Sequence, residues 1–143
     1  MAAGEICVRE VPLASTRALR QAVLRPHETV AQMAAHEPPG AVAVAAVQGG
    51  AVIAVGFVAP EGEPGAWRVR GMATAPESRG HGAGTAVLDA LTRHARAAGA
   101  RRIWCNARVS ARGFYDRAGF RVVSEQFELP HIGPHVVMER RLA

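Results

Sequence analysis

The sequence predicts a single α/β domain built on a mixed sheet that contains one β-α-β unit. Two valine-rich runs, 41–47 and 51–59, flank a Gly-Gly pair and so predict a hairpin. A helical pattern over 82–98 lies between strand-like runs at 67–74 and 102–107, and such a crossover joins parallel strands. The 143 residues are 49% apolar and 20% charged, which is enough for one core and requires no second domain.

The first forty residues predict one strand and two helices. Residues 6–8 are a short apolar run that indicates a strand. Ser15 or Thr16 can cap a helix with its apolar positions on one face, and Pro26 ends it. A weaker helical pattern covers 28–35. Two prolines and a glycine then break the chain before the hairpin.

The second half predicts two helices and the remaining strands. A third antiparallel strand follows the hairpin, and the long helix that comes next has Gly99 as a suitable stop. Ser110 is expected to cap a short helix that Gly119 closes. Two final strands are predicted at 120–127 and 136–140, which brings the sheet to about seven strands.

The charge is basic, and its distribution favours a small anionic ligand over a nucleic acid. The formal net charge is +5, and all 17 residues counted as Lys+Arg are arginines. They are mostly scattered along the chain, and aromatic residues make up only 5% of it. A nucleic-acid site normally combines clustered basic residues with aromatic platforms. We therefore predict no nucleic-acid partner.

The termini and cysteines indicate a cytoplasmic protein. The first ten residues have no cationic region followed by a long apolar run, and no segment reaches the roughly 20 apolar residues of a membrane span. We expect no contact with a membrane. Cys7 and Cys105 are expected to be reduced and buried. Their spacing relative to the histidines predicts no metal site.

The stretch 70–91 organises the chain, because it places Gly80, Gly82 and Gly84 between a strand and the long helix. Glycine at every second position keeps Cβ atoms away from the main chain. A helix start leaves about four amide donors without partners and carries roughly half a positive charge. Arg79 adds a planar cation. The pattern predicts an anion site for a phosphate or pyrophosphate.

Two common phosphate-binding motifs are excluded by specific residues. A dinucleotide-binding loop needs G-x-G-x-x-G and an acidic residue at the end of the next strand. Here the spacing is G-x-G-x-G, and residues 102–107 contain no carboxylate. A phosphate-loop NTPase needs a lysine after its glycine, and this chain has no lysine.

Two motifs resemble those of the GNAT superfamily of N-acetyltransferases. Residues 79–84, RGHGAG, fit the family signature R/Q-x-x-G-x-G/A between a strand and a helix. Residues 106–120, NARVSARGFYDRAGF, resemble the Asn-to-Gly-Phe segment that contains a tyrosine. The two motifs occur in the family's order, about 25 residues apart. The resemblance is specific over 67–123 and general before it.

The resemblance implies a GNAT fold, with a mostly antiparallel sheet whose fourth and fifth strands splay apart, and acetyl-CoA as the donor. The pantetheine arm would enter that gap and pair with the main chain of 72–74, with Asn106 on the opposite side. A backbone N–H near Met72 would polarise the thioester carbonyl. The amides of Arg79 and the three glycines would hold the diphosphate. The residues implied at the coenzyme are Met72, Ala73, Thr74, Arg79, Gly80, His81, Gly82, Ala83, Gly84, Thr85 and Asn106.

By the same resemblance, Tyr115 would protonate the leaving sulfur. The phenol also suits this role physically, because a pKa near ~10 keeps it protonated at neutral pH. From the residues alone, a core aromatic is the expected role of Tyr115, since it shares a helical face with Phe114 and Ala118.

The acceptor side is less defined. The base that takes the amine's proton could be Glu128, His131, His135 or a water relay. Arg70 could bind an anionic acceptor or simply project from the sheet. Cys105 could indicate an acyl-cysteine route, but it has no histidine or acid close in sequence to activate it, so a buried thiol is the expectation.

These observations predict an acetyl-CoA-dependent N-acetyltransferase that acts on a small amine or a protein amine by direct attack on the thioester. The alternative is a catalytically silent acyl-CoA-binding or regulatory module. Tyr115 distinguishes the two, because binding alone needs no proton donor beside the sulfur. Homodimers are common in the family, but nothing in this sequence demands one.

Overall fold

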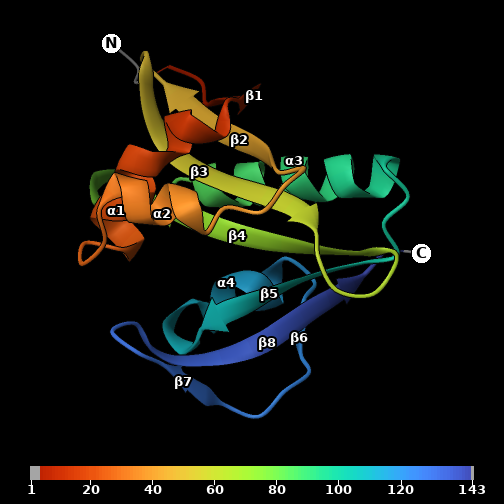
Figure 1. Ribbon diagram of the computed structural model, residues 1–143. Coiled ribbons are helices and arrows are strands. Elements are labelled where there is room, and N and C mark those ends of the chain that lie inside the picture. The colour runs from red at the N-terminus through yellow and green to blue at the C-terminus, as the bar shows by residue number, and fades with distance from the viewer. Residues whose placement is uncertain (1–3, 143) are drawn as a thin grey trace.

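The computed structural model describes residues 4–142, which form an eight-stranded open sheet with helices on both faces (Figure 1). The strand order is β1-β2-β3-β4-β5-β8-β6, and β7 also pairs with β8. The strands are β1 (Cys7–Val11), β2 (Val42–Gln48), β3 (Ala51–Pro60), β4 (Ala66–Thr74), β5 (Arg102–Arg108), β6 (Arg121–Val122), β7 (Phe127–Leu129) and β8 (Gly133–Arg141). The α-helices are α1 (Arg17–Leu24), α2 (Val30–Ala35), α3 (Ala83–Ala97) and α4 (Arg112–Arg117).

The sheet is antiparallel except between β4 and β5, which are parallel. The crossover from β4 through α3 to β5 confirms the predicted β-α-β unit, and β2 and β3 form the predicted hairpin. The mostly antiparallel mixed sheet is therefore as the sequence predicts.

β4 and β5 pair only at one end and then diverge. The pairing covers Ala66–Arg68 on β4 and Arg102–Trp104 on β5. Beyond these residues β4 pairs only with β3, and β5 only with β8. Figure 1 shows the two strands separating into two half-sheets. This is the splay that the sequence predicts between the fourth and fifth strands.

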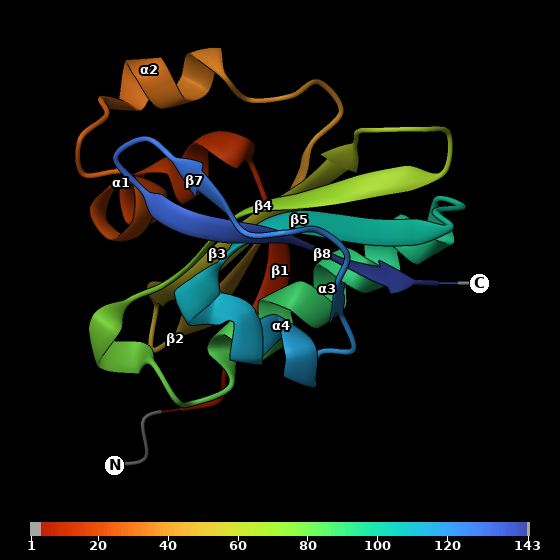
Figure 2. The same ribbon diagram turned by 90° about the horizontal axis from the view of Figure 1, so that it is seen from below.

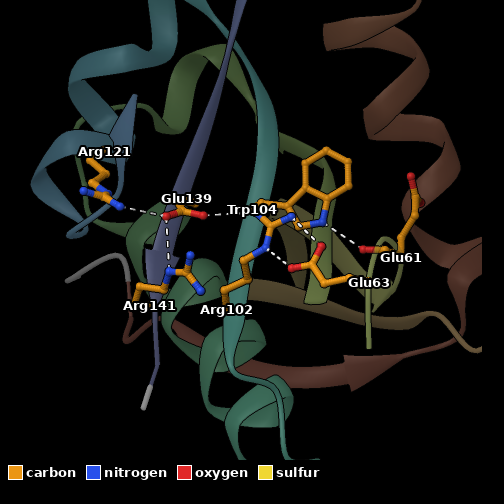
Figure 3. Close-up of polar contacts among 7 residues, drawn as sticks. All are labelled: Glu61, Glu63, Arg102, Trp104, Arg121, Glu139 and Arg141. Atoms are coloured by element: carbon orange, nitrogen blue, oxygen red, sulfur yellow. Dashed lines mark hydrogen bonds and ion pairs between the residues drawn. The ribbon is translucent and has the colours of Figure 1, made fainter. Parts of the chain in front are cut away.

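Polar contacts hold the paired end of the splay together (Figure 3). The Arg102 guanidinium bonds Glu63 in the β3–β4 turn at 2.7 Å and Glu139 on β8 at 3.2 Å. The Trp104 indole N–H donates to the Glu61 carbonyl oxygen at 2.8 Å. Glu139 is only 5% exposed and also receives bonds from arginines on β6 and β8. The turn and three strands are thereby fixed to one another.

The helices form two layers around the sheet (Figure 2). α3 packs on β2, β3 and β4 from one face, and its fully buried Val87, Leu88 and Leu91 belong to the main core. α1 and α2 lie over the opposite face, where α1 contacts β4. A smaller apolar cluster joins α1 to the middle of the sheet.

The predicted strand 120–127 is wrong as a single element, which is why the sheet has eight strands. The Ser124 hydroxyl accepts a hydrogen bond from the Val137 amide at 2.8 Å. A side chain thus occupies the position where a main-chain carbonyl would continue the ladder with β8. The chain breaks there into β6 and β7. The first strand is also longer and later than expected, at Cys7–Val11.

Two predicted helix caps are also wrong. The Thr16 hydroxyl donates to the Leu13 carbonyl oxygen at 2.7 Å and caps nothing. Ser110 lies inside a 3-10 turn, Val109–Ala111, that precedes α4. The cap that does form is at α2, where Thr29 and Gln32 make a reciprocal capping box.

Two further findings concern the helices and the cysteines. Within residues 4–142, no helix is long and apolar enough to cross a membrane.

Both cysteines are free, and Cys105 is buried as expected, but Cys7 is exposed on the edge strand β1. The expectation of burial is therefore wrong for Cys7.

Candidate active site

The loop between β4 and α3 has the conformation that its glycines predict. Gly80 and Gly82 have left-handed φ angles of 82° and 83°, which other residues rarely adopt. A Cβ added at either position would meet no protein atom within 4 Å. Gly84 differs, because its Cβ would lie 3.2 Å from Thr74 Oγ1. The first two glycines therefore border open space, and the third lets α3 begin close to the end of β4.

The amides of this loop lie where the sequence predicts an anion site. Among the described residues, no protein group accepts a hydrogen bond from the amides of Gly80, Gly82 or Gly84. Gly82 is the N-cap of the 15-residue helix α3, so the positive end of the helix dipole lies at the same place. Arg79 departs from the expectation, because its amide donates to the Pro76 carbonyl oxygen at 3.4 Å. Its exposed side chain remains available.

A cavity of about 630 Å³, here called the glycine cavity, opens beside this loop. Its volume is within the range of small-molecule and cofactor sites. Ser110, Phe114 and Arg117 also line it, although no motif in the sequence assigns them to a binding site. His81 and Asn106 do not line it. The remaining nine of the eleven predicted coenzyme residues do: Met72, Ala73, Thr74, Arg79, Gly80, Gly82, Ala83, Gly84 and Thr85.

A second cavity of about 400 Å³, here called the arginine cavity, lies next to the first. Asn106 lines this one instead. Two of its walls come from α1 and the β7–β8 loop, and a third from β4. Five arginines and one carboxylate line it: Arg20, Arg25, Arg68, Arg70, Arg108 and Glu28.

The two cavities meet where β4 and β5 have separated. Met72 on β4, Arg108 on β5 and Tyr115 on α4 line both of them. A group bound in one cavity therefore lies near a group bound in the other.

A bulge in β4 shapes the wall of the arginine cavity. Val55 faces Ala73 and Phe57 faces Arg70, so β4 has one more residue than β3 over this interval. Gly71 takes up the extra length with a left-handed φ of 66°. A Cβ there would lie 2.7 Å from Phe57 Cε1, so only glycine fits.

Tyr115 lies at the junction and is a neutral phenol. Its side chain is 7% exposed and packs edge-on against Phe114 and Phe120, with ring centroids 5.1 and 5.4 Å away. Burial, together with the neighbouring Cys105 thiol, raises the pKa of Tyr115 well above its ordinary value. Burial also raises the pKa of Cys105 to about 12. The thiol is therefore protonated at neutral pH, which is unfavourable for a nucleophile.

His135 on β8 is the predicted base candidate that the structure brings into the arginine cavity. Its ring is 4% exposed, and Nδ1 lies 2.8 Å from the Gly133 carbonyl oxygen. A carbonyl only accepts, so Nδ1 carries the proton and Nε2 of the neutral ring keeps its lone pair. Glu128 and His131 line neither cavity. Arg70, the fourth predicted substrate residue, lines the arginine cavity.

The family model described as "Acetyltransferase (GNAT) family" matches residues 11–120. An uncharacterized N-acetyltransferase of Bacillus subtilis (strain 168), YitI, is 30% identical over 142 residues, covering 94% of this chain and 95% of its own.

Solved structures share the fold at lower identity. The ribosomal-protein-S18-alanine N-acetyltransferase of Escherichia coli superposes with a TM-score of 0.80 at 14% identity, covering 97% of this chain and 95% of its own. An aminoglycoside 6'-N-acetyltransferase complexed with coenzyme A has a TM-score of 0.78 at 13% identity, covering 94% and 96%.

Proposed function

The chain belongs to the GNAT family of acetyltransferases, and from that premise we propose that it transfers the acetyl group of acetyl-CoA to a primary amine. The observation that carries the proposal is the junction of the two cavities at Met72 and Tyr115, inside the gap between β4 and β5. The glycine cavity would take the donor, and the arginine cavity would take the acceptor.

The residues of the glycine cavity fit a coenzyme A diphosphate. The amides of Gly80, Gly82 and Gly84 are donors without protein acceptors among the described residues, at the positive end of α3. The open space around Gly80 and Gly82 admits a phosphate to the main chain. The similar fold of an acetyltransferase complexed with coenzyme A supports this assignment.

Along β4, main-chain groups of 72–74 have no partner on β5. They would bind the extended pantetheine arm as a neighbouring strand does, and an N–H near Met72 would polarise the carbonyl. Asn106 lies on β5 and lines the acceptor side of the gap, where it would contact the arm from the opposite direction.

Acetyl-CoA supplies a thioester carbonyl as the electrophile and a thiolate as the leaving group. As the C–N bond forms and the C–S bond breaks, Tyr115 would donate its phenolic proton to the leaving sulfur, and the second proton lost by the acylated nitrogen would restore the phenol. The raised pKa of Tyr115 keeps its hydroxyl protonated throughout the neutral range before the reaction. His135 would take a proton from the acceptor ammonium at Nε2, since Nδ1 is held by Gly133. The acid and the base then face the same cavity.

The direct test is thiol release from acetyl-CoA in the presence of a panel of amines, amino acids, polyamines and peptides. Wild-type turnover on at least one amine supports the proposal. Tyr115→Phe should lower kcat by about 10²- to 10⁴-fold and leave coenzyme affinity nearly unchanged. Equal loss of both would assign Tyr115 a structural role. A coenzyme-induced melting shift without turnover on any amine would favour the silent binding module.

The base is tested with a matched pair of histidines. His135 lines the arginine cavity, whereas His131 is exposed and lines neither cavity. His135→Ala should lower kcat/KM by about 10²- to 10⁴-fold, and His131→Ala should leave it near the wild-type value. A wild-type kcat/KM for His135→Ala would eliminate this base.

A further inference from the structure

The arginine cavity carries more positive charge than the protein's own carboxylates neutralise. Glu37 pairs with both Arg17 and Arg20, at 2.7 Å each. Glu61 lies 2.7 Å from Arg68 and 3.6 Å from Arg70.

Arg25 and Arg108 are the other two arginines that line the cavity. Glu28 lies 3.7 Å from Arg25, and Arg108 has no carboxylate within 4.0 Å among the described residues. Among the described residues, three carboxylates contact four of the five arginines that line the cavity, and one of them, Glu37, is shared with Arg17, which does not line it. At least two of the five positive charges are therefore uncompensated.

Arg70 is only weakly paired by the protein's own groups. Its side chain is 26% exposed, and its contact with Glu61 is longer than the one Arg68 makes with the same carboxylate. Its other bond is to the His36 carbonyl oxygen, at 3.3 Å. Burial, and then the positive charge of Arg68, lowers the pKa of Arg70, so an additional anion would be stabilising there.

Arg108 approaches the same space from β5. It donates to the Leu24 carbonyl oxygen at 2.7 Å, which fixes the guanidinium against the end of α1. Burial and the charge of Arg25 lower the pKa of Arg108. Its remaining N–H groups have no carboxylate partner in the described part of the chain, and it lines both cavities.

We propose, on the basis of the acetyl-transfer function above, that the acceptor is a small amine that also carries a carboxylate or phosphate, and that Arg70 and Arg108 bind this anionic group. A cavity of about 400 Å³ admits a molecule of that size. A guanidinium group can donate two parallel hydrogen bonds to two oxygens of a carboxylate or of a phosphate. The same charge repels polycationic acceptors such as polyamines.

The acceptor class is tested with pairs of amines that differ in charge at one end. 4-Aminobutyrate is compared with butylamine, β-alanine with propylamine, and O-phosphoethanolamine with ethanolamine, by thiol release from acetyl-CoA. The anionic member should have the higher kcat/KM by about tenfold or more in at least one pair. The first two pairs report a carboxylate, and the third reports a phosphate. Equal or better use of the member without the anionic group in every pair overturns the proposal, while the transferase assignment stands.

Three charge-removing variants locate the effect. Arg70→Gln and Arg108→Gln should each reduce the preference for the anionic amine by about 10- to 100-fold, chiefly through KM. Arg93→Gln removes the same charge from an exposed position on α3 that lines neither cavity, and should leave the preference intact. An equal loss in all three would reduce the effect to net charge and overturn the assignment. Coenzyme affinity is measured in each variant, because Arg108 borders both cavities.

A binding measurement separates this proposal from the transferase assignment. Glutarate carries two carboxylates and no amine, so its calorimetric titration into the coenzyme-bound protein requires no turnover. Saturable binding that is weakened in Arg70→Gln and kept in Arg93→Gln supports the anion site even if no amine is acetylated. Absence of binding to the wild-type protein contradicts it even if some amine is acetylated.

Discussion

Replacing Gly82 with alanine tests whether bare main-chain donors at the start of α3 hold the coenzyme. The new Cβ would meet no protein atom within 4 Å, so the folded protein is affected only through the φ of 83°. That backbone conformation costs a non-glycine residue about 1–2 kcal/mol, or roughly 3–6 °C in Tm. The Cβ would project into the space a phosphate needs. Loss of one or two charged hydrogen bonds then weakens coenzyme A binding by about 10- to 100-fold.

Gly99 provides the matched control. It follows the other end of the same helix, with a φ of 89° and no atom within 4 Å of an added Cβ. Gly99→Ala should therefore lose about as much stability in urea unfolding as Gly82→Ala, while coenzyme A binds it in calorimetry as it binds the wild type. Equal coenzyme affinity in the two variants would refute the role of the loop amides.

Three further predictions concern the bulge, the closed end of the splay and the buried thiol. Gly71→Ala should lower the free energy of unfolding by about 2–4 kcal/mol in urea, because its Cβ would lie 2.7 Å from Phe57 Cε1 at a left-handed φ; a neutral substitution would contradict the bulge geometry. The Arg102 bond holds the pKa of Glu63 down to about 2 from an ordinary 4.5, so the unfolded chain binds more protons between these values and stability falls as the pH falls through them. Glu63→Gln should flatten the fall of Tm over that interval, and a curve parallel to that of the wild type would show the pair to be unimportant. Cys105→Ala should retain acetyltransferase activity, because burial raises the pKa of the thiol to about 12 and keeps it protonated. Loss of turnover in a folded variant would support the acyl-cysteine route.

Much of the fold could be predicted because its signals are local. The Gly-Gly turn, the helical pattern of α3 and the right-handed crossover rule together determine β2 to β5. The prediction failed where one side chain competes with the ladder, as Ser124 does by accepting from the Val137 amide. Nothing in the spacing of 120–127 distinguishes that serine from any other strand residue.

The donor side of the site was predictable because its signal is local in the sequence. The acceptor side was not predictable because its signal is not local. The glycine loop is a run of consecutive residues, whereas the arginine cavity is assembled from segments that are distant in sequence. One signal could have identified part of it. Arg68 and Arg70 are two residues apart on β4, as Asn106 and Arg108 are on β5. Residues two apart in a strand lie on the same face, so each strand has two polar residues on one face. The pairing of Arg20 with Glu37 has no such trace in the sequence.

The divergence of β4 and β5 also has a consequence for the handling of the protein. Past Arg68 and Trp104, each strand has a row of main-chain donors and acceptors without a partner strand, in the interior of the sheet. Such rows are templates for association with other chains when nothing covers them. A bound pantetheine would hydrogen-bond to these main-chain groups and cover them. The free energy by which it stabilises the fold would grow with the logarithm of ligand concentration. Coenzyme A in the purification and storage buffer should therefore reduce aggregation on warming more than an equal concentration of free phosphate does.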